Sequence, residues 1–230
     1  GRARADAVVV MDRYMEQRVL KKAPVASKLV VLPPWAHDVV TAPVAHVENP
    51  FRMQYIEDGA RAIMYSGNHT TTNPLTTLLE ATRAFNQARG LRFLFVGGGA
   101  AKAEVDHYVG PIVVSLPYQP LADLKWSLSA ADVHVVTMGE NMVGMSHPCK
   151  IYSALAVGRP ILFVGPRESH VGEILSKGDL GWQVAHGDVD GLIRILTRIE
   201  ATDSEALSAM GIRAQRASLE YFAPRLLTEQ

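Results

Sequence analysis

The sequence of 230 residues has one cysteine, no net charge and no long hydrophobic run. A single Cys149 excludes a disulfide framework within the chain and is typical of a reducing compartment. Lys plus Arg and Asp plus Glu number 23 each, so the composition predicts no binding to nucleic acid through bulk charge. No apolar run approaches the ~20 residues that a membrane-spanning helix needs.

The beginning of the sequence, GRARADAVVVMD, has no initiator methionine and leads at once into a strand pattern at residues 7–11. We therefore expect the chain to be a fragment of a longer protein. Hydrophobic residues make up 48% of the sequence and charged residues 20%, which is the composition of a globular protein. A chain of this length holds one large or two small domains.

A composition change divides the sequence into two parts. Strand patterns at residues 7–11 and 28–32 flank a helical pattern, and Pro33 and Pro34 then end regular structure, because proline lacks the N–H group that a continuing strand needs. Residues 36–50, with Pro43 and Pro50, are predicted to be a connector. We expect a first part at 1–45 and a second at 46–230.

The second part alternates between strand and helix patterns and predicts an α/β fold with a doubly wound parallel sheet. The apolar runs, such as FLFV at 93–96, lack alternation, as in strands covered by helices on both faces. Strands are predicted at 60–65, 92–96, 112–114, 133–137, 160–164 and 181–184. Helices are predicted at 74–89, 100–108, 120–130, 149–157, 171–177, 189–200 and 204–222.

The stretch SHPCKIYSALAVGRPILFVG, residues 146–165, indicates a phosphate site. It places Ser146, His147, Lys150 and Ser153 at the entrance and first turns of a predicted helix, where free N–H groups and a partial positive charge favour an anion. A capped helix packed on a sheet explains the same pattern. Strand ends elsewhere add glycine turns that let a ligand approach the backbone, at Gly67 beside Asn68 and His69, and at Gly97.

The glycines at 97–99 do not form a dinucleotide fingerprint, because the sixth position of that pattern is Lys102. A Gly-Lys-Ser/Thr phosphate loop is also missing, so a Rossmann dehydrogenase is disfavoured. After the strand at 112–114, the exposed backbone of residues 114–118, which include Leu116, can hydrogen-bond a nucleobase edge, and Tyr118 can stack on a ring. Packing of Tyr118 against the next helix is the alternative.

Metal-binding patterns are weak in this sequence. Asp188 and Asp190 form a D-x-D pair, but they open an apolar-periodic helix and are predicted to cap it. The eight histidines lack H-x-x-x-H or E-x-x-H spacing, so the sequence predicts no metal site and no cofactor.

Taken in order, several motifs resemble the C-terminal, nucleotide-sugar-binding half of GT-B glycosyltransferases. The resemblance is to glycosyltransferase family 4, and within it to bacterial polysaccharide-assembly members. It covers about residues 60–201 and is carried by SGN (66–68), PLTTLLEATRAF (74–85), FLFVGGGAAKAEV (93–105), VSLPYQPLADLKWSLSAADVHVV (114–136) and HPCKIYSALAVGRPILFVG (147–165). It implies that residues 1–45 are the end of an N-terminal domain and hinge, and 46–230 a C-terminal donor-binding domain with C-terminal helices.

The resemblance also implies roles for the polar residues. Gly67, Asn68, His69, Ser146 and Lys150 would hold the donor diphosphate, and Gly97, Leu116, Tyr118 and Ser153 the nucleoside. The chain departs from the family in two places: the first loop lacks the usual Arg and Lys, and the family's glutamate pair would fall near Met145 and Ser153. No catalytic residue is assigned.

The function implied is transfer of a sugar from a nucleoside-diphosphate donor to a glycan or polyprenyl-linked acceptor in cell-surface polysaccharide biosynthesis. Such enzymes are metal-independent and generally retaining. Their place is the cytoplasm, at the inner face of the membrane, although no basic amphipathic helix predicts peripheral attachment here. We expect this chain alone not to turn over. The alternatives are a non-catalytic nucleotide-sugar-binding module and a sugar-nucleotide epimerase of similar architecture.

Overall fold

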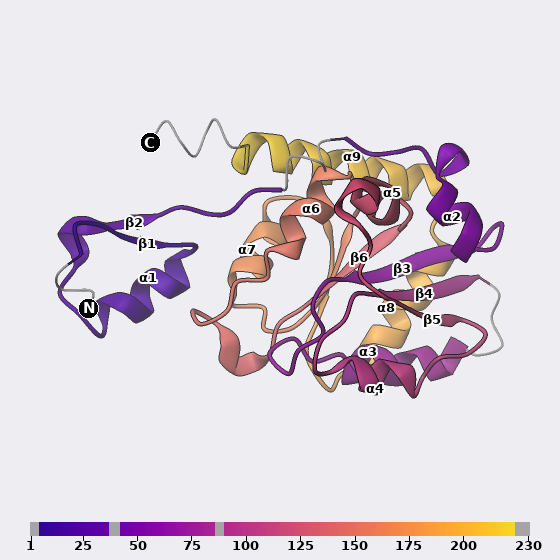
Figure 1. The fold of residues 1–230 in the computed structure, drawn as a ribbon, viewed down its shortest axis with the longest axis horizontal. Helices are drawn as coiled ribbons and strands as arrows, with labels where there is room; N and C mark the ends of the chain where they lie inside the picture. Colours follow the sequence, from indigo (N-terminus) through magenta and orange to yellow (C-terminus); the bar gives the residue numbers. More distant parts are fainter. Residues whose placement is uncertain (1–4, 37–41, 86–89, 224–230) are drawn as a thin grey trace.

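The computed structural model describes residues 5–36, 42–85 and 90–223, and its centre is a six-stranded parallel sheet (Figure 1). The order of the strands across the sheet is β5-β4-β3-β6-β7-β8. Their bounds are β3 Arg61–Ser66, β4 Leu91–Val96, β5 Val113–Leu116, β6 Val133–Thr137, β7 Ile161–Val164 and β8 Gly181–Val184. The α/β fold with a doubly wound parallel sheet is therefore confirmed.

Helices cover both faces of this sheet, which explains why its strands are apolar on both sides. One face packs against α3 (Thr76–Thr82), α4 (Lys102–Asp106) and α8 (Val189–Ala201). The other packs against α2 (Pro50–Tyr55), α5 (Leu124–Ser129), α6 (Lys150–Ala156), α7 (His170–Ser176) and α9 (Ser204–Tyr221). Short 3-10 turns complete this part at η3 (His46–Glu48), η4 (Arg83–Phe85), η5 (Leu121–Asp123) and η6 (Glu140–Met142).

The helices from α3 to α6 are shorter than the sequence pattern predicts, whereas α7, α8 and α9 agree with it to within one residue at each end. The helix predicted at 74–89 is α3 followed by η4, and its last residues, 86–89, lie outside the described residues. The predicted cap of α8 is confirmed, because Asp188 Oδ1 accepts a hydrogen bond of 2.8 Å from the Gly191 amide. None of the helices in the described part of the chain combines the length and apolar character that a membrane crossing requires.

The N-terminal unit, residues 5–36, has its own two-stranded parallel sheet (Figure 1). Strands β1 (Val8–Val10) and β2 (Leu29–Val31) pair in parallel, with α1 (Arg13–Leu20) and η2 (Ala26–Lys28) between them. Valine side chains from β1, α1 and the turn after it form a small core of their own. The division of the chain into 1–45 and 46–230 stays a prediction.

A helix that the sequence analysis missed begins at the end of the predicted connector. Helix α2 begins at Pro50, and the side chain of Asn49 caps it by accepting a hydrogen bond of 3.1 Å from the Arg52 amide. Arg52 also donates to Asp132 at 2.9 Å, which fixes α2 to the sheet. The prolines that predicted an irregular connector lie outside the helix or at its first position, where proline is tolerated.

The strand order places a switch point between β3 and β6. The chain runs from β3 through β4 to β5 on one side, and from β6 through β7 to β8 on the other. The loops that leave β3 and β6 therefore separate and leave a crevice at the carboxyl ends of these strands, where ligands bind in open α/β sheets.

Candidate functional site

A cavity of about 170 Å³ lies close to the carboxyl ends of β3 and β6. Gly67 and Lys150, both predicted to bind the diphosphate, line it together with Ser153, predicted to bind the nucleoside. The remaining lining residues are Ser66, Leu124, Leu128, His134, Val135 and Val136. No acidic side chain is among the described residues of this wall. The cavity is smaller than the ~300–1,000 Å³ of a typical small-molecule site, so it suits one part of a ligand.

Lys150 is the only cationic side chain among the described residues that line this cavity. Its Nζ lies 3.4 Å from the centroid of the Tyr65 ring, is buried, and has no hydrogen-bond partner among the described residues. Burial lowers the pKa of Lys150 to about 7, because removal from water disfavours the charged form. A cation–π contact compensates only part of this cost. An anion placed in the cavity would supply the missing partner.

Two glycine turns pack against each other beside Lys150. Gly67 has φ +127°, and a Cβ built on it would lie 3.6 Å from Lys150 Nζ. Gly97 has φ +132°, and a Cβ there would overlap the Gly67 carbonyl oxygen. The Tyr65 hydroxyl donates to the Asn68 carbonyl at 2.8 Å and holds the first turn in place. Both positions therefore require glycine, and the backbone of the turn stays open to a ligand.

His69 and Asn68 differ in their exposure. Asn68 is exposed, whereas the side chain of His69 is completely buried with its ring against Tyr65. Burial, with a contribution from the charge of Lys102, lowers the pKa of His69 to about 4. His69 is therefore neutral near pH 7 and adds no positive charge to the site. Its role in diphosphate binding stays a prediction.

The residues predicted to bind the nucleoside separate into two places. Ser153 lines the cavity with Lys150, while Tyr118 lies at the Gly97–Gly99 turn, where its hydroxyl donates to the Gly98 carbonyl at 3.3 Å. Tyr118 is 58% exposed and free to stack. The Leu116 carbonyl already accepts hydrogen bonds from the Gly97 amide and from Lys102 Nζ, both at 2.9 Å. The role of Leu116 in nucleoside binding stays a prediction.

The start of α6 also differs from the expectation. The amides of Cys149, Ile151 and Tyr152 donate to carbonyls of the preceding turn at 2.9–3.2 Å, so they are not free to bind a phosphate. Ser146 is half-buried in the loop before α6 and does not line the cavity. The residues of α6 that line the cavity are Lys150, in its first turn, and Ser153.

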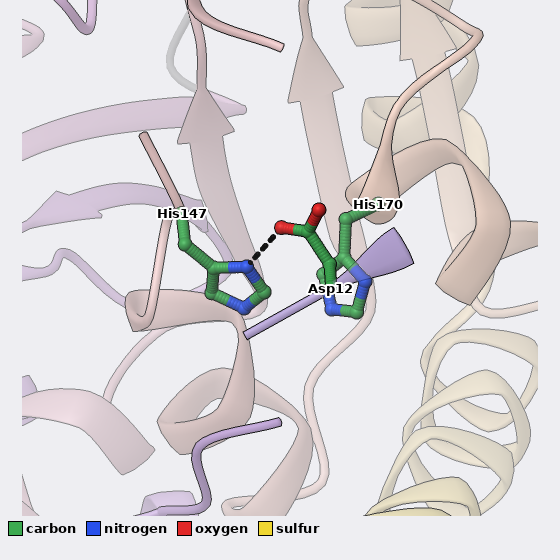
Figure 2. Close-up of side chains that lie close together, drawn as sticks. All are labelled: Asp12, His147 and His170. Carbon is green, nitrogen blue, oxygen red and sulfur yellow. Dashed lines mark hydrogen bonds and ion pairs between the residues drawn. The ribbon is translucent and has the colours of Figure 1, made fainter. Parts of the chain in front are cut away.

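A second cluster connects the N-terminal unit to α6 and α7 (Figure 2). Asp12 Oδ2 accepts from His147 Nδ1 at 2.7 Å, and the Tyr152 hydroxyl lies 2.7 Å from His147 Nε2 and 2.8 Å from His170 Nε2. Ligand-type atoms of Asp12, His147 and His170 lie within 4.8 Å of one another, a set that can hold a metal ion. In this structure hydrogen bonds already join these groups.

Sequence reasoning missed this cluster because its members are far apart. Asp12 and His147 are 135 positions apart, so no local spacing pattern brings them together. Burial, and the charge of His147, lower the pKa of His170 to about 4. For Asp12, burial favours the protonated form, but hydrogen bonds from His147 and the Met15 amide outweigh it and lower the pKa.

A larger cavity of about 740 Å³ lies along β8 and α8. Three exposed arginines line it, Arg167, Arg194 and Arg198, but so do Glu140, Glu168 and Asp188. Its charges are therefore balanced, and its arginines are solvated. The smaller cavity remains the better candidate for an anion, because the described part of the chain places a buried cation there, Lys150, and no counter-ion beside it.

The sheet order and the helix layers match the Rossmann-like domains of GT-B glycosyltransferases. Sucrose-phosphate synthase from Thermosynechococcus elongatus has this fold, with a TM-score of 0.78 and 20% identity over 98% of this chain and 56% of that one. HepE from Anabaena, solved with UDP and glucose, has a TM-score of 0.80 and 15% identity over 98% of this chain and 61% of that one.

Sequence comparison then gives the family. The profile described as Glycosyl transferases group 1 matches residues 60–201, and the chain belongs to this family. It is also 29% identical, over 210 residues, to a protein named Probable glycosyltransferase WbjE from Pseudomonas aeruginosa. That match covers 90% of this chain and 52% of the relative. The chain thus spans about half the length of the curated relative it matches.

Proposed function

We propose that this chain is the donor-binding part of a glycosyltransferase and that it binds the diphosphate of a nucleoside-diphosphate sugar at Lys150. Within the group 1 family, we place it in glycosyltransferase family 4. The reaction is transfer of the sugar to a glycan or lipid-linked acceptor in cell-surface polysaccharide biosynthesis, at the cytoplasmic face of the membrane. The observation that carries the proposal is the buried ammonium of Lys150 at the switch point of the sheet, for which residues 5–36, 42–85 and 90–223 supply no counter-ion.

The chemistry needs such a cation. When the bond between sugar and diphosphate breaks, negative charge accumulates on the leaving diphosphate, and a cation already in place stabilises that charge more than the ground state. Lys150 is held against Tyr65 without a competing carboxylate in the cavity wall, so no ion pair must be broken when the donor enters. The open backbone at Gly67 lets the phosphates approach closely.

A binding experiment tests the proposal. Calorimetric titration of the chain with UDP-glucose, UDP-N-acetylglucosamine and GDP-mannose should detect at least one donor, and Lys150→Met should weaken its binding about 10- to 100-fold, the contribution of a charge-assisted contact. The matched control is Lys125→Met, because Lys125 is an exposed lysine that also lies over an aromatic ring, that of Trp126. If Lys150→Met binds the donor as tightly as the native chain does, Lys150 does not bind the diphosphate.

The pH dependence of this affinity gives a second readout. Burial lowers the pKa of free Lys150 to about 7, and a bound diphosphate raises it again, so binding takes up a proton. The affinity should be constant below pH 7 and fall as the pH rises above it. The diphosphate of a nucleotide sugar is a diester that does not titrate in this range, so the change reports on the protein.

One observation favours a second candidate, a module that binds nucleotide sugars without catalysis. Where the family's glutamate pair would fall, this chain has Met145, which is 53% exposed, and Ser153 in the cavity wall. Release of UDP or GDP from the donor by the full-length protein, lost with Lys150→Met, would identify an enzyme. Binding without release would identify the module.

A further inference from the structure

Helix α6 carries Lys150 but lacks a side-chain cap of its own. The side chain of its N-cap residue, Cys149, makes no hydrogen bond to the first turn, so the start of this seven-residue helix depends on backbone hydrogen bonds to the turn before it. Lys150 is the first residue of this helix, so the place of its side chain depends on what holds the turn before α6.

The pair of His147 and Tyr152 supplies that restraint. His147 Nε2 and the Tyr152 hydroxyl are 2.7 Å apart, and the two rings stack with an interplanar angle of 8°. The bond closes a short loop of chain that contains Lys150. The Tyr152 ring also packs edge-on against Phe222, with the centroids 4.9 Å apart, so the loop is held on the body of the domain.

Asp12 links this loop to the N-terminal unit (Figure 2). One carboxylate oxygen caps α1 by accepting from the Met15 amide at 2.8 Å, and the other accepts from His147 Nδ1 at 2.7 Å. Both Asp12 and His147 are buried. A buried hydrogen bond to a carboxylate is among the strongest a side chain makes, and its two oxygens leave Asp12 no freedom to rotate.

We propose that Asp12, His147 and Tyr152 are positioning residues that hold Lys150 against the Gly67 turn. The N-terminal unit thereby sets the geometry of a phosphate-binding group on the other side of α6. The proposal rests on the proposed function for the role of Lys150, but the placement of Lys150 can be measured without a ligand.

The same cluster could also be a metal site. Its geometry favours instead the series of hydrogen bonds that joins Asp12, His147, Tyr152 and His170. The Tyr152 oxygen lies within 2.8 Å of Nε2 of both His147 and His170. It therefore fills the position from which an ion would contact both rings, and a bound zinc ion would have to displace it, since zinc lies about 2.0–2.1 Å from imidazole nitrogen.

The test uses Asp12→Ser, because serine keeps the cap of α1 but is too short to reach His147. In the native chain, NMR should show the His147 Nδ1 proton far downfield, and the Lys150 side-chain protons shifted upfield by the Tyr65 ring. In Asp12→Ser the first signal should vanish and the upfield shift should collapse. Asp203→Ser, at the cap of α9, is the matched control and should change neither signal. An unchanged Lys150 shift in Asp12→Ser would overturn the proposal.

Tyr152→Phe is a second variant in case Asp12→Ser does not fold. It removes only the hydroxyl and keeps the packing on Phe222, and it should also reduce the upfield shift of Lys150. Both variants should lower the affinity for the donor that binds the native chain most tightly, by about three- to thirtyfold. If no donor binds the native chain, the proposed function fails, while the ligand-free shifts still decide the positioning role. Stoichiometric zinc binding that moves the His147 and His170 signals together would overturn the series of hydrogen bonds.

Discussion

At the scale of single residues, Lys150 is a source of instability that binding can relieve. Its Nζ is buried with the Tyr65 ring as its neighbour and no hydrogen-bond acceptor among the described residues. Each unit of pKa shift corresponds to about 1.4 kcal/mol, so a pKa lowered from 10.5 to about 7 represents several kcal/mol against the charged form. Functional sites commonly retain such a loss of stability, because the group without a partner is the one that the ligand binds.

We expect Lys150→Met to raise the free energy of unfolding by about 1–3 kcal/mol at pH 6. Between pH 7 and 10.5 the unfolded native chain binds more protons at this position than the folded chain, so native stability rises with pH and the advantage of the variant shrinks. Urea denaturation at pH 6 and pH 9 measures both effects. Lys125→Met, at an exposed position, should show no such dependence. If Lys150→Met is less stable than the native chain at both pH 6 and pH 9, the burial of Lys150 does not destabilise the fold.

The residues of the cavity could be predicted from the sequence only where a local pattern identifies them. Lys150 lies in a motif that precedes one buried strand, and Gly67 directly follows a different buried strand. The structure brings both residues to one cavity. The exposure of Asn68 and the burial of His69 could not be predicted, because both lie in the same short loop. The partners of Asp12 could not be predicted either, since they come from distant parts of the chain.

At the scale of elements, the strands could be predicted more closely than the helices. Strands β6 and β8 have the predicted bounds. β6 is buried at every residue, as expected of a strand that helices cover on both faces. Helix ends depend on hydrogen bonds that propensity does not encode. The missed α2 did have a local signal, an Asn-Pro pair that caps and starts a helix, but two prolines nearby suggested a connector.

The contact between the turns after β3 and β4 predicts a sharp sequence requirement. We expect Gly97→Ala to lower the free energy of unfolding by about 2–4 kcal/mol, because a Cβ combines an unfavourable φ of +132° with overlap on the Gly67 carbonyl. Gly59→Ala is the control: its φ is +82° and the space around it is open, so it should lose only about 1 kcal/mol. Equal losses in urea denaturation would show that the contact between the turns is unimportant.

At the scale of the whole molecule, the contacts around α1 join two sheets that do not share a strand. Asp12 bonds to His147, Arg13 pairs with Glu173, and the Tyr14 carbonyl faces Gly144. The doubly wound sheet follows from the alternation of strands and helices. The docking of the N-terminal unit does not, because it depends on single contacts between segments with no common pattern.

Gly144 provides the test of this docking. Its φ is +70°, and a Cβ there would lie 2.7 Å from the Tyr14 carbonyl oxygen, which forces the loop and α1 apart. Gly144→Ala should therefore speed hydrogen exchange of the α1 amides at least about fivefold, which corresponds to ~1 kcal/mol of lost local stability. Gly187→Ala has nearly the same backbone strain, with φ +81°, but meets nothing within 4 Å, so it should leave exchange in α1 unchanged. If both variants speed exchange equally, backbone strain alone is responsible. If only Gly144→Ala does so, the contact with Tyr14 holds the N-terminal unit on the domain that carries Lys150.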